Sequence, residues 1–194
     1  MALIQSVTVG DRIIDLHQFS GEVMEEKKWA TTQVTSAGGG YNVNTGQNNP
    51  VTISSINRTH DQFFLKSDTG QEMAVELTDA GLALRKGHRV TVFWGIIHGQ
   101  ANGKYVAIYN HTTNSLTKMD DAINGLAMKP ASGLVSLAFI ASIFGICLYG
   151  LGFIGLVVLY IFWRIRKQRN LELVAILQAA LDGAIAEAKA AKVA

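Results

Sequence analysis

The chain has almost no cysteine, and this absence excludes the frameworks that cysteine builds. Cys147 is the only cysteine among 194 residues, so no disulfide can form within the chain and no cysteine-based zinc site is possible. The five histidines are scattered, no pair sits at i and i+4 on a predicted helix, and no H-E-x-x-H motif occurs. We therefore predict neither a metal ion nor a cofactor.

The sequence also lacks the common catalytic and nucleotide-binding motifs. There is no G-x-S-x-G, no Walker loop and no G-x-G-x-x-G, and the glycines at 38–40 are not followed by Lys-Ser or Lys-Thr. His60 and Asp61 are adjacent, as a base and its orienting group would be, yet no motif places a nucleophile beside them. No catalytic residue is predicted, and an enzyme with a loop-borne site ranks third among the functions considered.

A strong charge of one sign is missing as well. Seventeen basic and fifteen acidic residues give a formal net charge of +2, which is too balanced for bulk electrostatics to favour nucleic-acid binding. The N-terminal MALIQSVTVGDRIIDL has neither a basic n-region nor a continuous apolar h-region, so no cleavable signal peptide is predicted. The N-terminal domain is accordingly expected in the cytoplasm.

Charge is entirely missing from residues 131–163, which read ASGLVSLAFIASIFGICLYGLGFIGLVVLYIFW. A spanning helix needs about 20 apolar residues, so the sequence predicts an anchor in a bacterial inner membrane, between a linker (118–130) and a tail (164–194). The run is too long for one ordinary span, and glycines near 150–155 favour a helical hairpin, with a single span as the alternative. The residues expected at the membrane interface are aromatic or basic: Tyr160, Trp163, Arg164, Arg166, Lys167 and Arg169.

Residues 1–117 show the alternation of apolar and polar residues that is typical of strands. The segment 51–56 has period two, and residues 61–66 and 71–77 flank a short turn, 67–70, that ends in glycine and closes a hairpin. The pattern resembles that of small OB- and SH3-like barrels. The predicted fold is therefore a mainly β soluble domain forming a small closed barrel, with an open sandwich as the alternative.

A basic turn precedes an aromatic residue on the strand that follows residue 88. The candidate recognition surface comprises Arg85, Lys86, His88, Arg89 and Trp94. Basic residues beside an aromatic ring suit a single-stranded nucleic acid, and the same cluster could contact anionic lipid headgroups. Basic clusters at turns are more often simply solvated, so neither ligand is favoured.

The tail is predicted to be an amphipathic helix that takes part in assembly. Its apolar face, at spacings of three and four, comprises Leu171, Val174, Leu177, Leu181 and Ile185. Three surfaces could cover this face: the barrel of the same chain, another tail helix or the bilayer surface. Neighbouring alanines permit close helix approach and favour another helix.

Together these features predict a non-enzymatic, membrane-anchored binding or scaffold subunit. Its partners would be the lipid bilayer and a membrane protein or a second copy of the chain, while nucleic-acid binding has little support. The alternative is a membrane-tethered regulator in which a Gly- and Asn-rich loop, residues 35–50, closes over a small molecule. We expect this loop to be mobile, because it has few apolar groups with which to offset the entropy of ordering.

Overall fold

The chain is built mainly from antiparallel strands. The computed structural model describes residues 2–42, 46–48, 50–128 and 152–190. Its strands are β1 (Ala2–Val9), β2 (Arg12–Gly38), β3 (Tyr41–Asn42), β4 (Gln47–Asn48), β5 (Val51–Lys66), β6 (Glu72–Thr78), β7 (Arg89–Ile97), β8 (Lys104–Asn110) and β9 (Ser115–Lys118). The helices are α1 (Asp120–Ala127) and α3 (Gly152–Ala190). The mainly β part of the predicted fold is confirmed.

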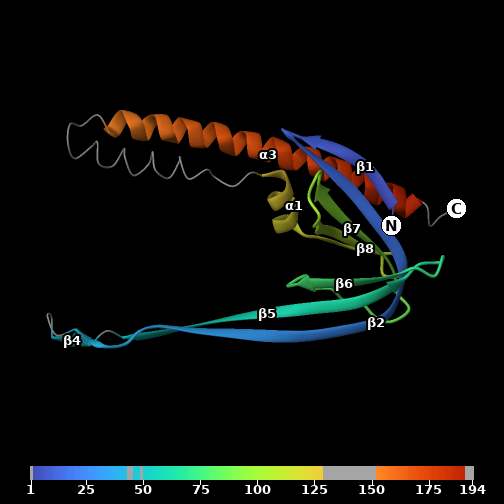
Figure 1. Ribbon diagram of the computed structural model, residues 1–194, viewed down its shortest axis with the longest axis horizontal. Helices are drawn as coiled ribbons and strands as arrows, with labels where there is room; N and C mark the ends of the chain where they lie inside the picture. Colours follow the sequence, from blue (N-terminus) through green and yellow to red (C-terminus); the bar gives the residue numbers. More distant parts are fainter. Residues whose placement is uncertain (1, 43–45, 49, 129–151, 191–194) are drawn as a thin grey trace. The chain divides into compact units, whose positions relative to one another are not determined.

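Seven strands pair in one sheet in the order β6-β5-β2-β7-β8-β9, with β1 pairing β2, and β3 and β4 form a separate two-stranded sheet. β2 and β5 lie side by side along most of their length (Figure 1). The order has two ends, β6 and β9, and among the described residues no pairing joins them. The predicted closure into an OB- or SH3-like barrel is therefore wrong, and the described strands form an open sheet.

The chain divides into two compact units, and β2, β7 and β8 each contribute to both. Unit 1 comprises Met1–Phe19, Val92–Ile108 and Lys118–Ala194. Unit 2 comprises Ser20–Thr91 and Tyr109–Thr117. Each unit has its own apolar core, so the packing of each can be explained separately.

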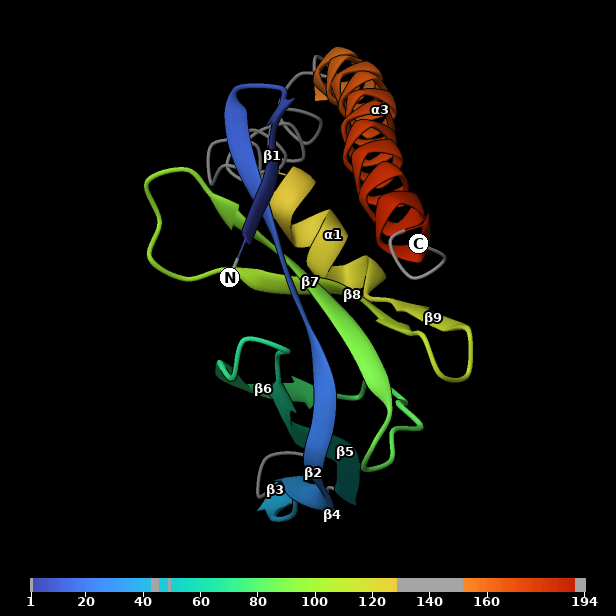
Figure 2. The ribbon, with the colours of Figure 1, turned by 90° about the vertical axis from the view of Figure 1, so that its right-hand side faces the viewer.

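Unit 1 packs two helices against strands. α1 lies between α3 and strands β7 and β8 (Figure 2). Close approach is possible because β7 has glycine at 95, where a Cβ would lie 2.8 Å from Cδ1 of Leu126. Arg12 donates from Nη1 to the carbonyl of Leu126 at 3.2 Å and so satisfies the C-terminal end of α1. Ile123 and Leu126 are buried beneath these contacts.

Unit 2 has its core on one face of β5 and β6. Phe63, Leu65 and Val75 are at most 1% exposed, and Leu84, on the segment that leads into β7, is 7% exposed. Phe63 pairs across the ladder with Val75, which places both side chains on the same face. The turn between β5 and β6 is closed by the amide of Gly70 donating to the carbonyl of Ser67 at 2.9 Å, as the sequence predicts.

The membrane-spanning part of the predicted fold is wrong. Across residues 2–42, 46–48, 50–128 and 152–190, no helix is both long and apolar enough to cross a membrane. α3 is one helix that runs through the basic cluster at 164–169, and its uncharged part, 152–163, is only about 12 residues or about 18 Å. The rest of the predicted anchor, 131–151, lies outside the described residues. The inner-membrane localisation stays a prediction.

The segment predicted as a loop between residues 35 and 50 is partly strand. β2 continues to Gly38, and Tyr41–Asn42 pairs with Gln47–Asn48. Threonine and serine fit the extended backbone, and the glycines that suggested a loop begin only at the end of β2. Residues 43–45 and 49 lie outside the described residues.

Candidate interaction site

The outer parts of β2 and β5 form a long two-stranded extension of unit 2. The register of this antiparallel pair runs from Glu22↔Lys66 to Gly38↔Val51. We call the outer part, Thr31–Gly38 paired with Val51–Arg58, the hairpin arm. Eight residue pairs at about 3.4 Å each give it a length of about 27 Å.

The arm begins where the neighbouring strands end. On the β5 side, the ladder with β6 ends at His60↔Thr78. One residue further, the amide of Asp79 donates to the carbonyl of Thr59 at 2.7 Å, and the amide of Thr59 donates to Oδ1 of Asp79, also at 2.7 Å. Asp79 has a φ of 55°, a left-handed conformation that turns the chain away from β5.

On the β2 side, the backbone pairing with the β7 region reaches Val23, whose amide donates to the carbonyl of His88 at 2.8 Å. Beyond Val23, the described residues of β2 form backbone ladder pairs only with β5. The hairpin arm therefore presents two open strand edges, one from β2 and one from β5. Open edges offer rows of backbone donors and acceptors to another strand.

The side chains of the arm are exposed on both faces. Val34 is 64% exposed, Val51 59%, Ile53 70% and Ile56 51%. Arg58 is the only charged residue in the two strands of the arm. Native proteins commonly protect an open edge with lysine, proline or a bulge, and the one β-bulge of this pair lies at the base, between Val23 and Glu25. The arm is thus an exposed, nearly uncharged strand pair.

Aromatic and basic residues gather at the base of the arm. Trp29 and His60 are ladder partners whose rings stack at 5.2 Å between centroids, with an interplanar angle of 11°. The His60 ring also contacts two hydroxyls, with Nε2 3.0 Å from Oγ1 of Thr31 and Nδ1 3.4 Å from Oγ1 of Thr78. Lys27 Nζ lies 5.7 Å from the centroid of the Trp29 ring. These contacts link β2, β5 and β6 next to the residues where the arm begins.

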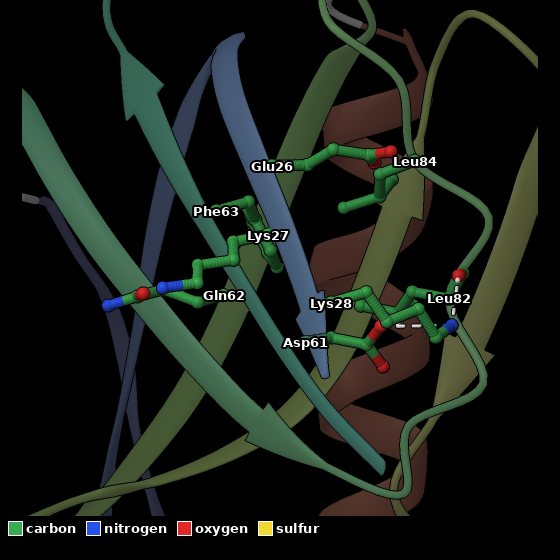
Figure 3. A pocket seen from close by; sticks show the side chains of 8 residues that line it. All are labelled: Glu26, Lys27, Lys28, Asp61, Gln62, Phe63, Leu82 and Leu84. Atoms are coloured by element: carbon green, nitrogen blue, oxygen red, sulfur yellow. Dashed lines mark hydrogen bonds and ion pairs between the residues drawn. The ribbon is translucent and has the colours of Figure 1, made fainter. Parts of the chain in front are cut away.

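The opposite face of the base carries a buried carboxylate. Asp61 is 6% exposed, and its Oδ1 accepts from Lys28 Nζ at 3.0 Å, while the same ammonium donates to the carbonyl of Leu82 at 3.3 Å (Figure 3). Asp61 Oδ2 is buried and has no hydrogen-bond partner among the described residues. His60 and Asp61, adjacent in sequence, thus lie on opposite faces of β5 and do not act as a base and its orienting group.

A small pocket lies beside this ion pair. It is lined by Glu26, Lys27, Lys28, Asp61, Gln62, Phe63, Leu82 and Leu84 (Figure 3). Its cavity volume is about 60 Å³, which is room for a few water molecules and far below the 300–1,000 Å³ of typical ligand pockets. The described residues contain no group of three or more His, Cys, Asp or Glu side chains that could hold a metal ion.

The residues of the predicted recognition surface do not share one exposed site. Arg85, Lys86 and Arg89 are exposed in unit 2, where Arg89 forms an ion pair with Asp68. His88 is half-buried, and its Nδ1 lies 2.9 Å from Nδ2 of Asn110. Trp94 belongs to unit 1, is 8% exposed and stacks on His17 at 5.5 Å. The tryptophan ring is therefore not an exposed stacking platform beside the basic cluster.

α3 carries the residues that the sequence assigned to the membrane interface and to assembly. Tyr160, Trp163, Arg164, Lys167 and Arg169 are exposed and Arg166 is half-buried, with the Tyr160 and Trp163 rings 6.2 Å apart. On the predicted assembly face Val174, Leu177, Leu181 and Ile185 are at most 9% exposed, whereas Leu171 is 58% exposed. α3 contacts β1 and α1 of the same unit, so this face is covered by the chain itself, the first of the three possible surfaces.

The alternation at 51–56 predicted one strand of the hairpin arm, but its pairing with 31–38 was not predicted, although a further signal was present. From Ala30 to Asn57 no residue is charged, and threonine, serine, valine and isoleucine alternate on either side of the glycines. Such a stretch suits a strand that pairs with another chain better than it suits a mobile loop.

No protein-family model matches the chain, and no curated protein or solved structure shows significant similarity to it.

Proposed function

We propose that this chain is a non-enzymatic binding or scaffold protein that recognises an extended segment of a partner through its hairpin arm. The observation that carries the proposal is the combination of two open edges with an arm that is exposed on both faces and bears a single charge. An incoming strand would gain main-chain hydrogen bonds from the edge and side-chain contacts from the alternating residues.

The energetics of the arm support the same function. A two-stranded hairpin by itself is marginally stable in water, and three or more strands or a packed face are needed for independent stability. The eight residue pairs of the arm extend past the core of unit 2 without burying side chains. A third strand supplied by a partner would provide the additional backbone pairing and packing that the chain itself does not supply at the arm.

The small-molecule regulator has less support. The pocket at the base of the arm has a volume of about 60 Å³, and the Lys28–Asp61 ion pair forms part of its wall. Half of the predicted closing loop is strand, namely the end of β2 at 35–38 and the two-stranded tip at 41–42 and 47–48. An arm that extends as paired strands suits contact with a macromolecule better than closure over a metabolite.

Site-specific photocrosslinking in the cells that naturally make the protein tests this function. A benzophenone amino acid would replace Ser54, which is exposed at the centre of the β5 edge, and in a separate strain Gln100, which is exposed on the turn between β7 and β8. We expect covalent adducts from position 54 and none from position 100 after irradiation. No adduct from position 54, or equal adducts from both positions, would contradict recognition through the arm.

A further inference from the structure

We propose that the partner strand is the β5 edge of a second copy of this chain, so that two arms pair antiparallel through Val51–Arg58. This inference rests on the proposed function and specifies its partner. Both copies carry the same open edge, so one contact between two copies gives each arm a third strand. A two-fold axis perpendicular to the paired strands makes the contact the same from either side.

The β5 edge is favoured over the β2 edge by its side chains. Val51, Ile53 and Ile56 are large, exposed and β-branched, whereas Val34 is the only large exposed apolar residue on the β2 strand of the arm. Cross-strand pairs of β-branched residues are among those that stabilise sheets. An added strand at β5 therefore gains more side-chain contact than one at β2.

The sheet of unit 2 already uses the same edge of β5. β6 pairs antiparallel with this edge up to His60↔Thr78, and the ladder ends at the Thr59–Asp79 contact. A strand added antiparallel at Val51–Arg58 would run in the same direction as β6 and extend the ladder toward the tip. Its length of eight residues lies within the usual range of strand lengths.

Charge permits this pairing and selects its direction. The edge carries one charge, Arg58, at the end nearest unit 2. Antiparallel pairing centred near Ser54 places the two Arg58 side chains about 20 Å or more apart, well beyond a Debye length of about 8 Å. A parallel, in-register pairing would instead bring the two guanidinium groups together. The neutral centre of the edge offers no like-charge repulsion against a second copy.

The mass of the purified 194-residue chain is the first test. Sedimentation velocity over a concentration series should show a monomer of 21.0 kDa in exchange with a dimer of about 42 kDa, twice that mass. Ile53→Lys should raise the dimer dissociation constant at least about tenfold, because it adds a charge to each copy at the edge. Val34→Lys is the matched control, because Val34 on the β2 strand is 64% exposed and Ile53 is 70% exposed, and it should change the dissociation constant less than about threefold.

The outcomes separate this inference from the proposed function. Both substitutions lie on exposed side chains, and an unchanged circular dichroism spectrum confirms that each variant folds. A dimer that survives Ile53→Lys, or that both substitutions weaken equally, would overturn pairing through β5. The wild-type chain could stay monomeric in sedimentation and give photocrosslinked adducts at position 54 whose mass differs from about 42 kDa. This result would overturn the second copy as partner but leave the proposed function standing. No adduct at position 54 would remove both.

Discussion

Thr59 and Asp79 exchange two hydrogen bonds across the edge of unit 2, one through the backbone and one through the aspartate carboxylate, each of 2.7 Å. The carboxylate takes the place that the next carbonyl of β6 would have taken on the ladder. The backbone amide and carbonyl of Thr59 are therefore both satisfied where β6 ends. The open edge of β5 starts at the preceding residue in sequence, Arg58. A single side chain thus marks the boundary between the covered and the open part of β5.

Asp79→Ala should destabilise the chain by about 1–2 kcal/mol. It removes a charge-assisted hydrogen bond and puts a residue with a Cβ but no polar side chain at a φ of 55°. Urea unfolding measures the loss, and hydrogen exchange at the Thr59 amide should become faster. Asp79→Asn is the control, since asparagine tolerates this conformation and keeps an acceptor oxygen. An equal loss in both variants would mean that the contact is not what ends β6.

Lys28→Met should cost about 1–3 kcal/mol of unfolding free energy, because it leaves the buried Asp61 carboxylate without its ammonium partner. The value is below that of a fully buried pair since the Lys28 side chain is 53% exposed. Adding Asp61→Asn to Lys28→Met should recover part of the loss. Lys27→Met, on the other face of β2, should stay within about 0.5 kcal/mol of wild type. Equal effects at 27 and 28 would contradict a specific ion pair.

Leu177→Ala should destabilise unit 1 by about 2–5 kcal/mol, as expected for a leucine that is 1% exposed and leaves a cavity when truncated. Leu171→Ala, the same substitution on the same helix at a position that is 58% exposed, should change stability by less than about 0.5 kcal/mol. Thermal or urea unfolding compares the two. A large loss at Leu171 would show that this side chain is covered in solution by a surface outside its own unit.

Acid should weaken unit 1 at Asp15. Ser6 Oγ donates to Oδ1 of this carboxylate at 2.6 Å and His98 Nδ1 lies 3.1 Å from Oδ2, which together lower the pKa of Asp15 below its ordinary value of 3.8. Because the folded-state pKa is the lower one, the stabilisation is present above the unfolded-state pKa and is lost as pH falls through the folded-state pKa. Ser6→Ala removes the largest cause and should raise the pKa of Asp15.

Carboxyl carbon NMR titration of wild type and Ser6→Ala measures this pKa directly. The acid-induced loss of stability should begin at a higher pH in Ser6→Ala than in wild type. Thr8→Ala on the same strand, whose ladder partner is Ile13, should leave the titration of Asp15 unchanged. If Ser6→Ala titrates like wild type, the hydroxyl is not the group that lowers the pKa.

Local signals in the sequence predicted the β-hairpins well. The Ser67–Gly70 turn is recognisable because its glycine and the two alternating runs that flank it are close together in the sequence. In the structure Gly70 has a φ of 82°, which glycine adopts readily. The apolar stripe of the tail was recognisable for the same reason, and Val174, Leu177, Leu181 and Ile185 are indeed buried. The elements that α3 contacts are β1, more than 150 residues away in sequence, and α1, about 50 residues away, and no local pattern contains that information.

The two errors have different causes. The barrel was inferred from turn chemistry, which specifies that strands follow one another but not that the first and last strands pair. The membrane anchor was inferred from a count of apolar residues, whereas α3 continues through four basic residues to Ala190. The alternation at 51–56 correctly predicted strand on the β5 side of the arm, whereas residues 35–38 on the β2 side were assigned to a loop because they are small or polar and run into three glycines.

The core of unit 2 ends before the arm begins, so the number of residues in the arm is not constrained by folding. Removing one residue pair, for example one each from Thr31–Gly38 and Val51–Arg58, shortens the reach by about 3.4 Å and exchanges the faces of the part beyond it. Removing two pairs shortens it by about 7 Å and restores the original faces. The length of open edge that the arm offers to another strand can therefore change only in steps of one residue pair.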